Sequence, residues 1–154
     1  MNDELQKVID RLQEHISLAP SEFLKYPEGE LRRRPAPGKW SKKELLGHLI
    51  DSAANNHHRF VRAQFENEPL VLVPYEQNDW NQVQKYNEVD TKFLVEFWRM
   101  YNLYIIQLIN NFPKEKLKVK CKSTDGRETA ENILLLIIDY ADHLDHHLKQ
   151  IFNN

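Results

Sequence analysis

The sequence predicts an all-α protein in the form of a four-helix bundle, and two observations support this prediction. Seven prolines divide the chain into proline-free stretches at residues 1–19, 38–68, 75–112 and 114–154, and proline is disfavoured inside a helix. Each stretch carries apolar residues at spacings of three and four, which is typical of an amphipathic helix. Strand patterns are almost absent. Four such helices bury their apolar stripes against one another in a bundle.

The first two helices are expected at about residues 2–18 and 42–66. Five apolar residues mark the buried stripe of the first helix: Leu5, Val8, Ile9, Leu12 and Ile16. Ser41 precedes the second helix and Glu44 follows three residues later. This spacing predicts a capping box, in which each side chain bonds to the other residue's backbone. Residues 20–40 are expected to connect the two helices.

The last two helices are expected at about residues 90–112 and 129–152. Asp90 or Thr91 can cap the third helix, which should end where the next proline follows. Thr129 is the expected cap of the fourth helix. Isolated helices of this length are marginal in water, so their stripes need mutual burial.

The remaining segments are expected to be connections within one domain covering residues 1–154. Residues 67–89 should form a long irregular link between the second and third helices. The segment Leu117–Arg127 alternates weakly and then turns at Asp125-Gly126, which indicates a short hairpin. The chain shows no internal repeat.

Composition restricts the class of protein further. Lys and Arg number 21 against 23 Asp and Glu, for a net charge of -2, so no basic excess indicates binding to nucleic acid. The longest aliphatic run, Ile133–Ile138, is too short to cross a membrane, and the first residues do not resemble a signal peptide. The one cysteine, Cys121, excludes an intrachain disulfide and a multi-cysteine metal site. We therefore expect a cytoplasmic protein that contacts neither nucleic acid nor membrane.

Three of the seven histidines fall where they can meet inside the bundle. His143 and His147 are four residues apart, about 40° from each other on a helical wheel, at one edge of the last helix's apolar stripe. His48 lies at the corresponding edge of the second helix. In contrast, His57 points nearly opposite to His48 and is expected in solvent, and His146 falls toward a charged face.

Such a trio can hold a metal ion. Neutral imidazole is the commonest metal ligand in proteins, and a site with three histidines leaves positions open for water or substrate. The alternative is that a histidine pair at helical spacing is only the polar rim of a core, and the spacing leaves both interpretations open. The string from His143 to His147, HLDHH, lacks the glutamate that follows the first histidine of zincin proteases, which excludes that class.

Two strings in the chain resemble signatures of the DinB-like superfamily, and especially of its YfiT-like branch. One is PGKWSKKELLGHLIDSAANNHHRF, similar to a tryptophan-led loop entering a helix whose His-Leu-x-Asp segment holds the first metal ligand. The other is YADHLDHHLKQI, similar to the closing motif H-x-x-H-H-x-x-Q-I, whose first and third histidines are ligands. With the link string VPYEQNDW, the likeness covers about residues 30–152. Matched position by position, it implies His48, His143 and His147 as ligands.

The resemblance implies a DinB/YfiT-like four-helix bundle that holds zinc or nickel and often forms a homodimer. Characterised members include bacillithiol or mycothiol S-transferases and a mycothiol-dependent maleylpyruvate isomerase. Many others are known only as metal-dependent hydrolases. A small electrophilic substrate and a low-molecular-weight thiol cofactor are therefore expected, with no polymerase activity. The surplus of Phe, Tyr and Ile on the third helix gives local support for a dimer.

Three functional hypotheses stay open at this stage. The first is an enzyme in which the metal activates a thiol or water for transfer to, or hydrolysis of, a small electrophile. The second is a non-catalytic metal-binding or stress-related bundle, and the third is a bundle without metal. No general base accompanies the three ligands, so the catalytic residues are unknown.

Asp51, one turn after His48, either orients a ligand or a metal-bound water or is a surface carboxylate. Gln150, three residues after His147, either forms a hydrogen bond near the site or is a solvated amide, and we expect the second.

Other side chains have two possible roles each. Trp40 is expected to pack against the start of the second helix. Tyr75 lies in the long link, which either covers the metal end or packs elsewhere. The basic run Arg32–Arg34 is either solvated or paired with an anionic thiol. Tyr101 and Tyr104 are expected in the core.

Overall fold

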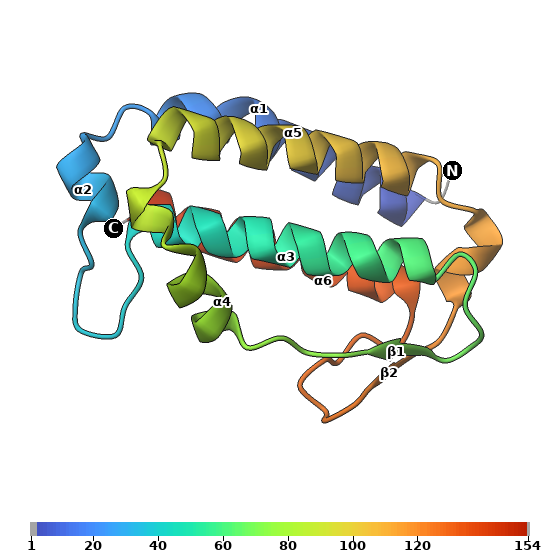
Figure 1. The fold of residues 1–154 in the computed structure, drawn as a ribbon. Coiled ribbons are helices and arrows are strands. Elements are labelled where there is room, and N and C mark those ends of the chain that lie inside the picture. The colour runs from blue at the N-terminus through green and yellow to red at the C-terminus, as the bar shows by residue number, and fades with distance from the viewer. Residues whose placement is uncertain (1–2, 154) are drawn as a thin grey trace.

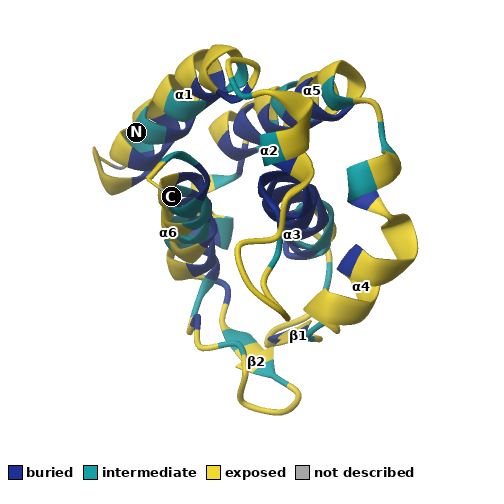
Figure 2. Cartoon of the chain, turned by 90° about the vertical axis from the view of Figure 1, so that its left-hand side faces the viewer, coloured by how far each residue is buried: buried dark blue, intermediate teal, exposed yellow. Residues whose placement is uncertain are grey.

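Four long helices form a bundle in the computed structural model, which describes residues 3–153. They are α1 (Asp3–Phe23), α3 (Lys42–Arg62), α5 (Thr91–Asn110) and α6 (Ile133–Phe152). Helices α1 and α3 each pack against both α5 and α6, so α1 lies diagonally opposite α3 (Figure 2). The apolar stripes meet in one core. This arrangement confirms the predicted four-helix bundle.

The directions of the helices explain the long second link. Helices α3 and α5 run in the same direction, whereas α1 and α6 run the opposite way (Figure 1). Two consecutive parallel helices need a connection that returns along the bundle. Residues 63–90 make that return and form β1 (Leu70–Leu72), α4 (Gln77–Gln84) and the 3-10 helix η1 (Tyr86–Glu88). The expected long link between these two helices is therefore confirmed, whereas the expectation that residues 67–89 are irregular is wrong.

The hairpin predicted at Leu117–Arg127 is also wrong. Strand β2 (Cys121–Ser123) pairs in parallel with β1, and the residues before it form the 3-10 helix η2 (Lys114–Lys118). Both Leu70 and Leu72 of β1 are buried. Strand β2 therefore pairs with the distant β1, and Lys120 beside it forms an isolated antiparallel bridge with Asn132.

The N-terminal helix is longer than the expected range 2–18. Helix α1 continues through Pro20 to Phe23, although proline removes one backbone hydrogen bond. Ala19 and Phe23 extend the buried stripe, and only 2% of the Phe23 surface is exposed. Burial of an aromatic side chain offsets the lost bond. The short helix α2 (Glu28–Arg32) follows within the predicted connection.

Helix starts follow the predicted caps in two of three cases. Ser41 and Glu44 form the capping box of α3, confirming that prediction. Asp90, one of the two candidates, accepts a hydrogen bond at 2.9 Å from the backbone N–H of Phe93 and so caps α5. Both helices end earlier than expected, α3 at Arg62 rather than 66 and α5 at Asn110 rather than 112.

The predicted start of the last helix at Thr129 is wrong. Asn132 is the N-cap of α6, because its side chain accepts from the backbone N–H of Leu135 at 3.0 Å. The residues before it extend along β2: the carbonyl of Glu131 accepts from the N–H of Cys121 at 2.9 Å. These backbone bonds hold residues 129–132 outside the helix. Among the described helices, none combines the length and apolar character needed to cross a membrane.

Gly47 allows the return link to close onto α3. A Cβ atom at this position would lie only 2.1 Å from Cδ2 of Tyr86, so the tyrosine ring packs directly on the helix backbone. The Tyr86 hydroxyl donates to Asp51, one turn further along α3. Glycine inside a helix is unfavourable, and the close approach of Tyr86 is the reason that this helix contains one.

We predict that Gly47→Ala destabilises the fold by about 1–3 kcal/mol, because the added methyl group overpacks the contact with Tyr86. Urea unfolding followed by circular dichroism measures the change. Gly29→Ala is the matched control, since nothing lies within 4 Å of a Cβ at that position. Equal stability of the Gly47→Ala variant and the wild type would contradict this packing.

Candidate metal centre

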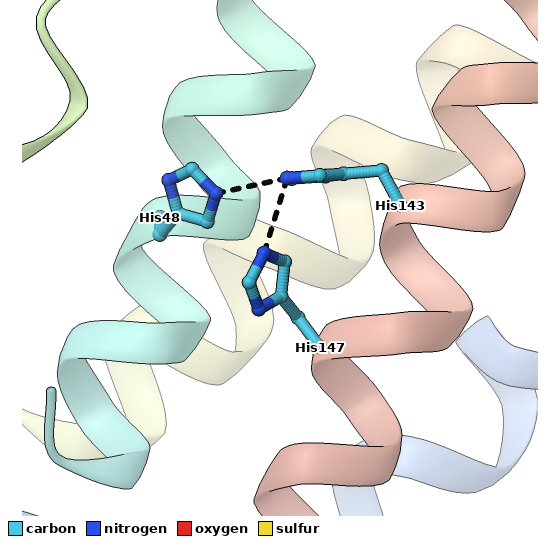
Figure 3. A group of neighbouring side chains, drawn as sticks. All are labelled: His48, His143 and His147. Carbon is cyan, nitrogen blue, oxygen red and sulfur yellow. Dashed lines mark hydrogen bonds between the residues drawn. The ribbon is translucent and has the colours of Figure 1, made fainter. Parts of the chain in front are cut away.

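The antiparallel pair α3 and α6 brings three histidines together. His48 comes from the first half of α3, and His143 and His147 come from the second half of α6 (Figure 3). The Nε2 atom of His143 lies 2.9 Å from Nε2 of His48 and 3.1 Å from Nε2 of His147. One ligand atom from each ring lies within 4.8 Å of the other two. The structure therefore groups the three residues that the sequence singled out.

These distances fit a single bound ion. Three nitrogen ligands about 2.05 Å from a tetrahedral zinc ion lie about 3.3 Å from one another, close to the two observed separations. The three side chains point into the space between α3 and α6, and one nitrogen of each ring lies beside that of a neighbour (Figure 3). The remaining coordination positions would be open to water or substrate.

Hydrogen bonds alone do not satisfy this cluster. Nδ1 of His147 lies 2.7 Å from Oε1 of Gln150; an amide oxygen only accepts, so Nδ1 carries the proton and Nε2 of the neutral ring carries a lone pair. Nε2 of His143 faces that lone pair and also Nε2 of His48. A single ring N–H cannot point at both. A cation would accept a lone pair from each of the three nitrogens, so the donor set suits a metal.

Burial keeps the three rings neutral. Burial, together with smaller contributions from the charges of His143 and His147, lowers the pKa of His48 to about 3. Burial and, to a smaller extent, the charges of His147 and His146 lower the pKa of His143 to about 4. The pKa of His147 is also lowered by burial, against the opposing hydrogen bond to Gln150. Neutral imidazole is the form that binds a metal.

Two side chains support the cluster from outside. Gln150 fixes the tautomer of His147, so the expectation of a solvated amide is wrong. The spacing of three residues along one helix face was the available signal for this contact. Trp40 is half-buried against the core, as predicted, and its ring centroid lies 4.8 Å from that of His48. Such outer contacts orient ligands and are typical of metal sites.

Asp51 is buried and ties the return link to α3. Its Oδ1 atom accepts hydrogen bonds from the Tyr86 hydroxyl and, at 2.7 Å, from Nε2 of Gln84. Its Oδ2 atom is buried without a hydrogen-bond partner among the described residues. Burial raises the pKa of Asp51 against both hydrogen bonds. The alternative of a surface carboxylate is therefore wrong, and a role in orienting a ligand stays a prediction.

The other histidines of α3 and α6 lie away from the cluster's centre. His146 is exposed, as expected. His57 is half-buried rather than solvated, because Nδ1 lies 3.0 Å from the Tyr101 hydroxyl and the ring packs against Tyr104. Tyr104 is 51% exposed and Tyr101 is half-buried. The prediction that these two tyrosines lie in the core is wrong for Tyr104, whereas Tyr101 packs against the edge of the core.

A polar cavity of about 150 Å³ reaches the cluster. Its lining consists of residues from α3, α6 and the two links: Ser52, Asn56, Arg59, Tyr75, Gln77, Glu128, Leu136, Asp139, Tyr140 and His143. Tyr75, Gln77 and Glu128 also line an outer cavity of about 510 Å³. The return link thus covers part of the metal end, one of its two expected roles. Arg59 pairs with Glu128 at 2.6 Å, a contact across 69 residues that no local sequence pattern indicates.

A comparison with protein families identifies the family of this chain. A family model described as the DinB superfamily matches residues 4–151. The chain belongs to the DinB superfamily. The resemblance noted from the sequence is thereby confirmed over nearly the whole chain. A search of curated proteins found no match.

Two solved structures share this DinB fold. YfiT from Bacillus subtilis, described as a probable metal-dependent hydrolase with an unusual four-helix bundle topology, is 19% identical and superposes with a TM-score of 0.83 over 99% of this chain and 86% of that chain. A mycothiol-dependent maleylpyruvate isomerase is 11% identical, with a TM-score of 0.74 over 96% of this chain and 60% of that chain. At these identities the likeness establishes the fold alone.

We predict that single changes of His48, His143 or His147 to Ala each remove metal from this DinB protein, because two remaining imidazoles hold an ion weakly. Elemental analysis after zinc loading and dialysis measures the bound metal. The variants His57→Ala and His146→Ala are the controls and should retain it. Loss of metal in His146→Ala with retention in His147→Ala would show that the motif has been matched in the wrong register.

We also predict that the metal-free protein loses stability as the pH falls from about 6.5 to about 4. In the unfolded chain the three rings titrate near their ordinary pKa of 6.5, whereas in the folded protein His48 and His143 titrate near 3 and 4. In this window the unfolded state binds more protons, so the free energy of unfolding decreases with decreasing pH.

Urea unfolding at several pH values, with a chelator present, measures this dependence. The double variant His48→Asn/His143→Asn should show a smaller pH dependence than the wild type, and His146→Asn should behave like the wild type. An equal pH dependence in all three proteins would contradict the burial of neutral histidines.

Proposed function

We propose that this protein is a metal-dependent enzyme in which His48, His143 and His147 hold one divalent ion, zinc or nickel. The substrate would be a small electrophile, and the nucleophile a low-molecular-weight thiol or water, with thiol transfer preferred. The observation that carries the proposal is the convergence of three Nε2 atoms. No assignment of protons to the three neutral rings makes every one of their close contacts a hydrogen bond. The names of the two similar structures, a metal-dependent hydrolase and a thiol-dependent isomerase, support it.

A bound divalent ion would supply Lewis acidity, lowering the pKa of a thiol or water in contact with it. The protein's own residues do the rest. Burial keeps the three rings neutral at physiological pH, and Gln150 presents Nε2 of His147 toward the common point. Trp40 packs beside His48 and restrains the orientation of its ring. The cavity that includes His143 in its wall gives a small substrate room beside the ligands.

The alternative is a non-catalytic metal-binding or stress-related bundle. The cavity against His143 favours the enzyme, because an ion that is only retained needs no adjoining space for a second molecule. A bundle without metal is disfavoured because Nε2 of His143 cannot form hydrogen bonds with the Nε2 atoms of both other histidines. A cytoplasmic location belongs to the same proposal.

The test uses zinc-loaded and nickel-loaded protein with a reactive electrophile, monochlorobimane, and a set of simple thiols. We expect thiol consumption above the uncatalysed rate, absent in His147→Ala and in chelator-treated protein. Hydrolysis of 4-nitrophenyl acetate without thiol tests the water route. Bound metal with no turnover in either assay would favour the non-catalytic alternative and contradict the enzyme.

A homodimer is also proposed, through the outer face of α5. Phe93, Phe97 and Tyr101 stack in a row along this face, and Phe93 is 64% exposed. Exposed aromatic rows of this kind favour association. We expect Phe97→Lys to weaken the dimer in analytical ultracentrifugation, and a wild type that sediments as a monomer at micromolar concentration would contradict the proposal.

A further inference from the structure

A second cavity of ligand size lies beside the metal centre and is distinct from the one that reaches His143. It has a volume of about 550 Å³, within the range of small-molecule sites. Its lining comes from α2, the loop before α3, the start of α3 and the end of α6. Two of its wall residues contact the histidine cluster. Trp40 packs on His48, and Gln150 lies 2.7 Å from His147. A molecule in this cavity would therefore sit against the supports of two ligands.

The charge of this cavity is predominantly positive. Arg33, Lys39 and Lys42 line it, against one carboxylate from Glu30. Arg33 and Lys39 are exposed and make no side-chain hydrogen bond or ion pair with the described residues. Lys42 is different: its ammonium donates to the carbonyl of Ile151, and burial lowers its pKa. Two cations thus remain available to a ligand.

The three arginines of the basic run at 32–34 have different surroundings in the structure. Arg34 is engaged by Glu44, with Nε 3.0 Å from Oε2. Arg32 lies outside this cavity and lines a different one. Arg33 is therefore the member of the run that directs its charge to the space beside Trp40. The lining of this cavity also has an apolar part, which consists of Trp40, Leu45, Pro35 and Ala36.

We propose that this cavity binds a small organic anion, carrying carboxylate or phosphate groups on an apolar body, as the second substrate of the metal centre. The role of this anion as a substrate rests on the proposed function, whereas its binding in the cavity does not. Arg33 and Lys39 pair with the anionic groups, and the apolar part lies on Trp40 and Leu45. The two cavities flank the metal centre: the one at His143 contacts a ligand, and this one contacts the side chains that support His48 and His147. Two flanking cavities suit transfer between two substrates better than hydrolysis of one.

The competing explanation is that Arg33 and Lys39 are ordinary solvated surface cations, and a matched charge control separates the two. Calorimetric titration of zinc-loaded protein uses three probes: benzylsuccinate, phenyl phosphate and the neutral benzyl alcohol. We expect submillimolar binding of at least one anion, weakened by salt because charges are exposed, and no binding of the alcohol. The tighter anion identifies the preferred group.

The variant Arg33→Ala/Lys39→Ala should bind that anion at least tenfold more weakly and keep its zinc. The control Arg32→Ala/Lys122→Ala removes the same charge elsewhere on the surface and should bind within twofold of the wild type. Quenching of tryptophan fluorescence by the anion gives a second readout, which Trp40→Phe should reduce. An unchanged affinity in the first variant, an equal loss in the control, or no binding of either anion would overturn the proposal.

The outcome is separable from that of the proposed function. Anion binding that depends on Arg33 and Lys39, without any metal-dependent turnover, would overturn the enzyme and leave this site in place. Metal-dependent turnover that is unchanged in Arg33→Ala/Lys39→Ala would overturn the second-substrate role and leave the enzyme in place.

Discussion

The antiparallel packing of α3 against α6 places Nε2 of His48 2.9 Å from Nε2 of His143, across 95 residues of sequence. Both helices present apolar stripes to the same core, and the histidines lie at the edges of those stripes. The register between the two helices therefore decides whether a trio exists at all. A slide of one turn, about 5.4 Å, would separate the rings. The capping box at Ser41 and the Asn132 cap fix where each helix begins, and the packing of the two apolar stripes in the core holds the register between them.

Placing three imidazoles in a bundle has an electrostatic consequence. Buried polar groups are costly unless they find partners, and like charges cannot accumulate in a small volume of low dielectric constant. The pKa values of His48 and His143 are accordingly lowered. Burying three imidazoles makes the core less stable than a fully apolar one, and it provides three neutral nitrogen donors close to one another. Gln150 contributes the proton acceptor that decides which nitrogen of His147 stays free.

The parallel course of α3 and α5 explains why so much of the chain lies outside the bundle. A return link is unavoidable, and this protein uses it to build the surroundings of the site. Tyr86 anchors the link on Gly47 and Asp51, and Tyr75 lines the cavity at His143. The loop before α3 supplies the other side, with Trp40 and two available cations. The two flanks of the metal centre therefore differ in charge and in shape.

Local sequence patterns were sufficient to predict the features that depend on the geometry of a single helix. The four helices, the capping box and the spacing of His143 and His147 all follow from 3.6 residues per turn, which is the same in every helix. The resemblance to DinB-like motifs added His48, which periodicity alone could only place at a stripe's edge. The tertiary structure decided what depends on contacts between distant segments: the parallel pairing of β1 and β2, the late start of α6, the anchoring role of Asp51 and the partner of Arg59. These features arise from packing in three dimensions, where a buried group bonds to whichever segment the fold brings to it. Because the partner is distant in sequence, local sequence patterns do not predict it.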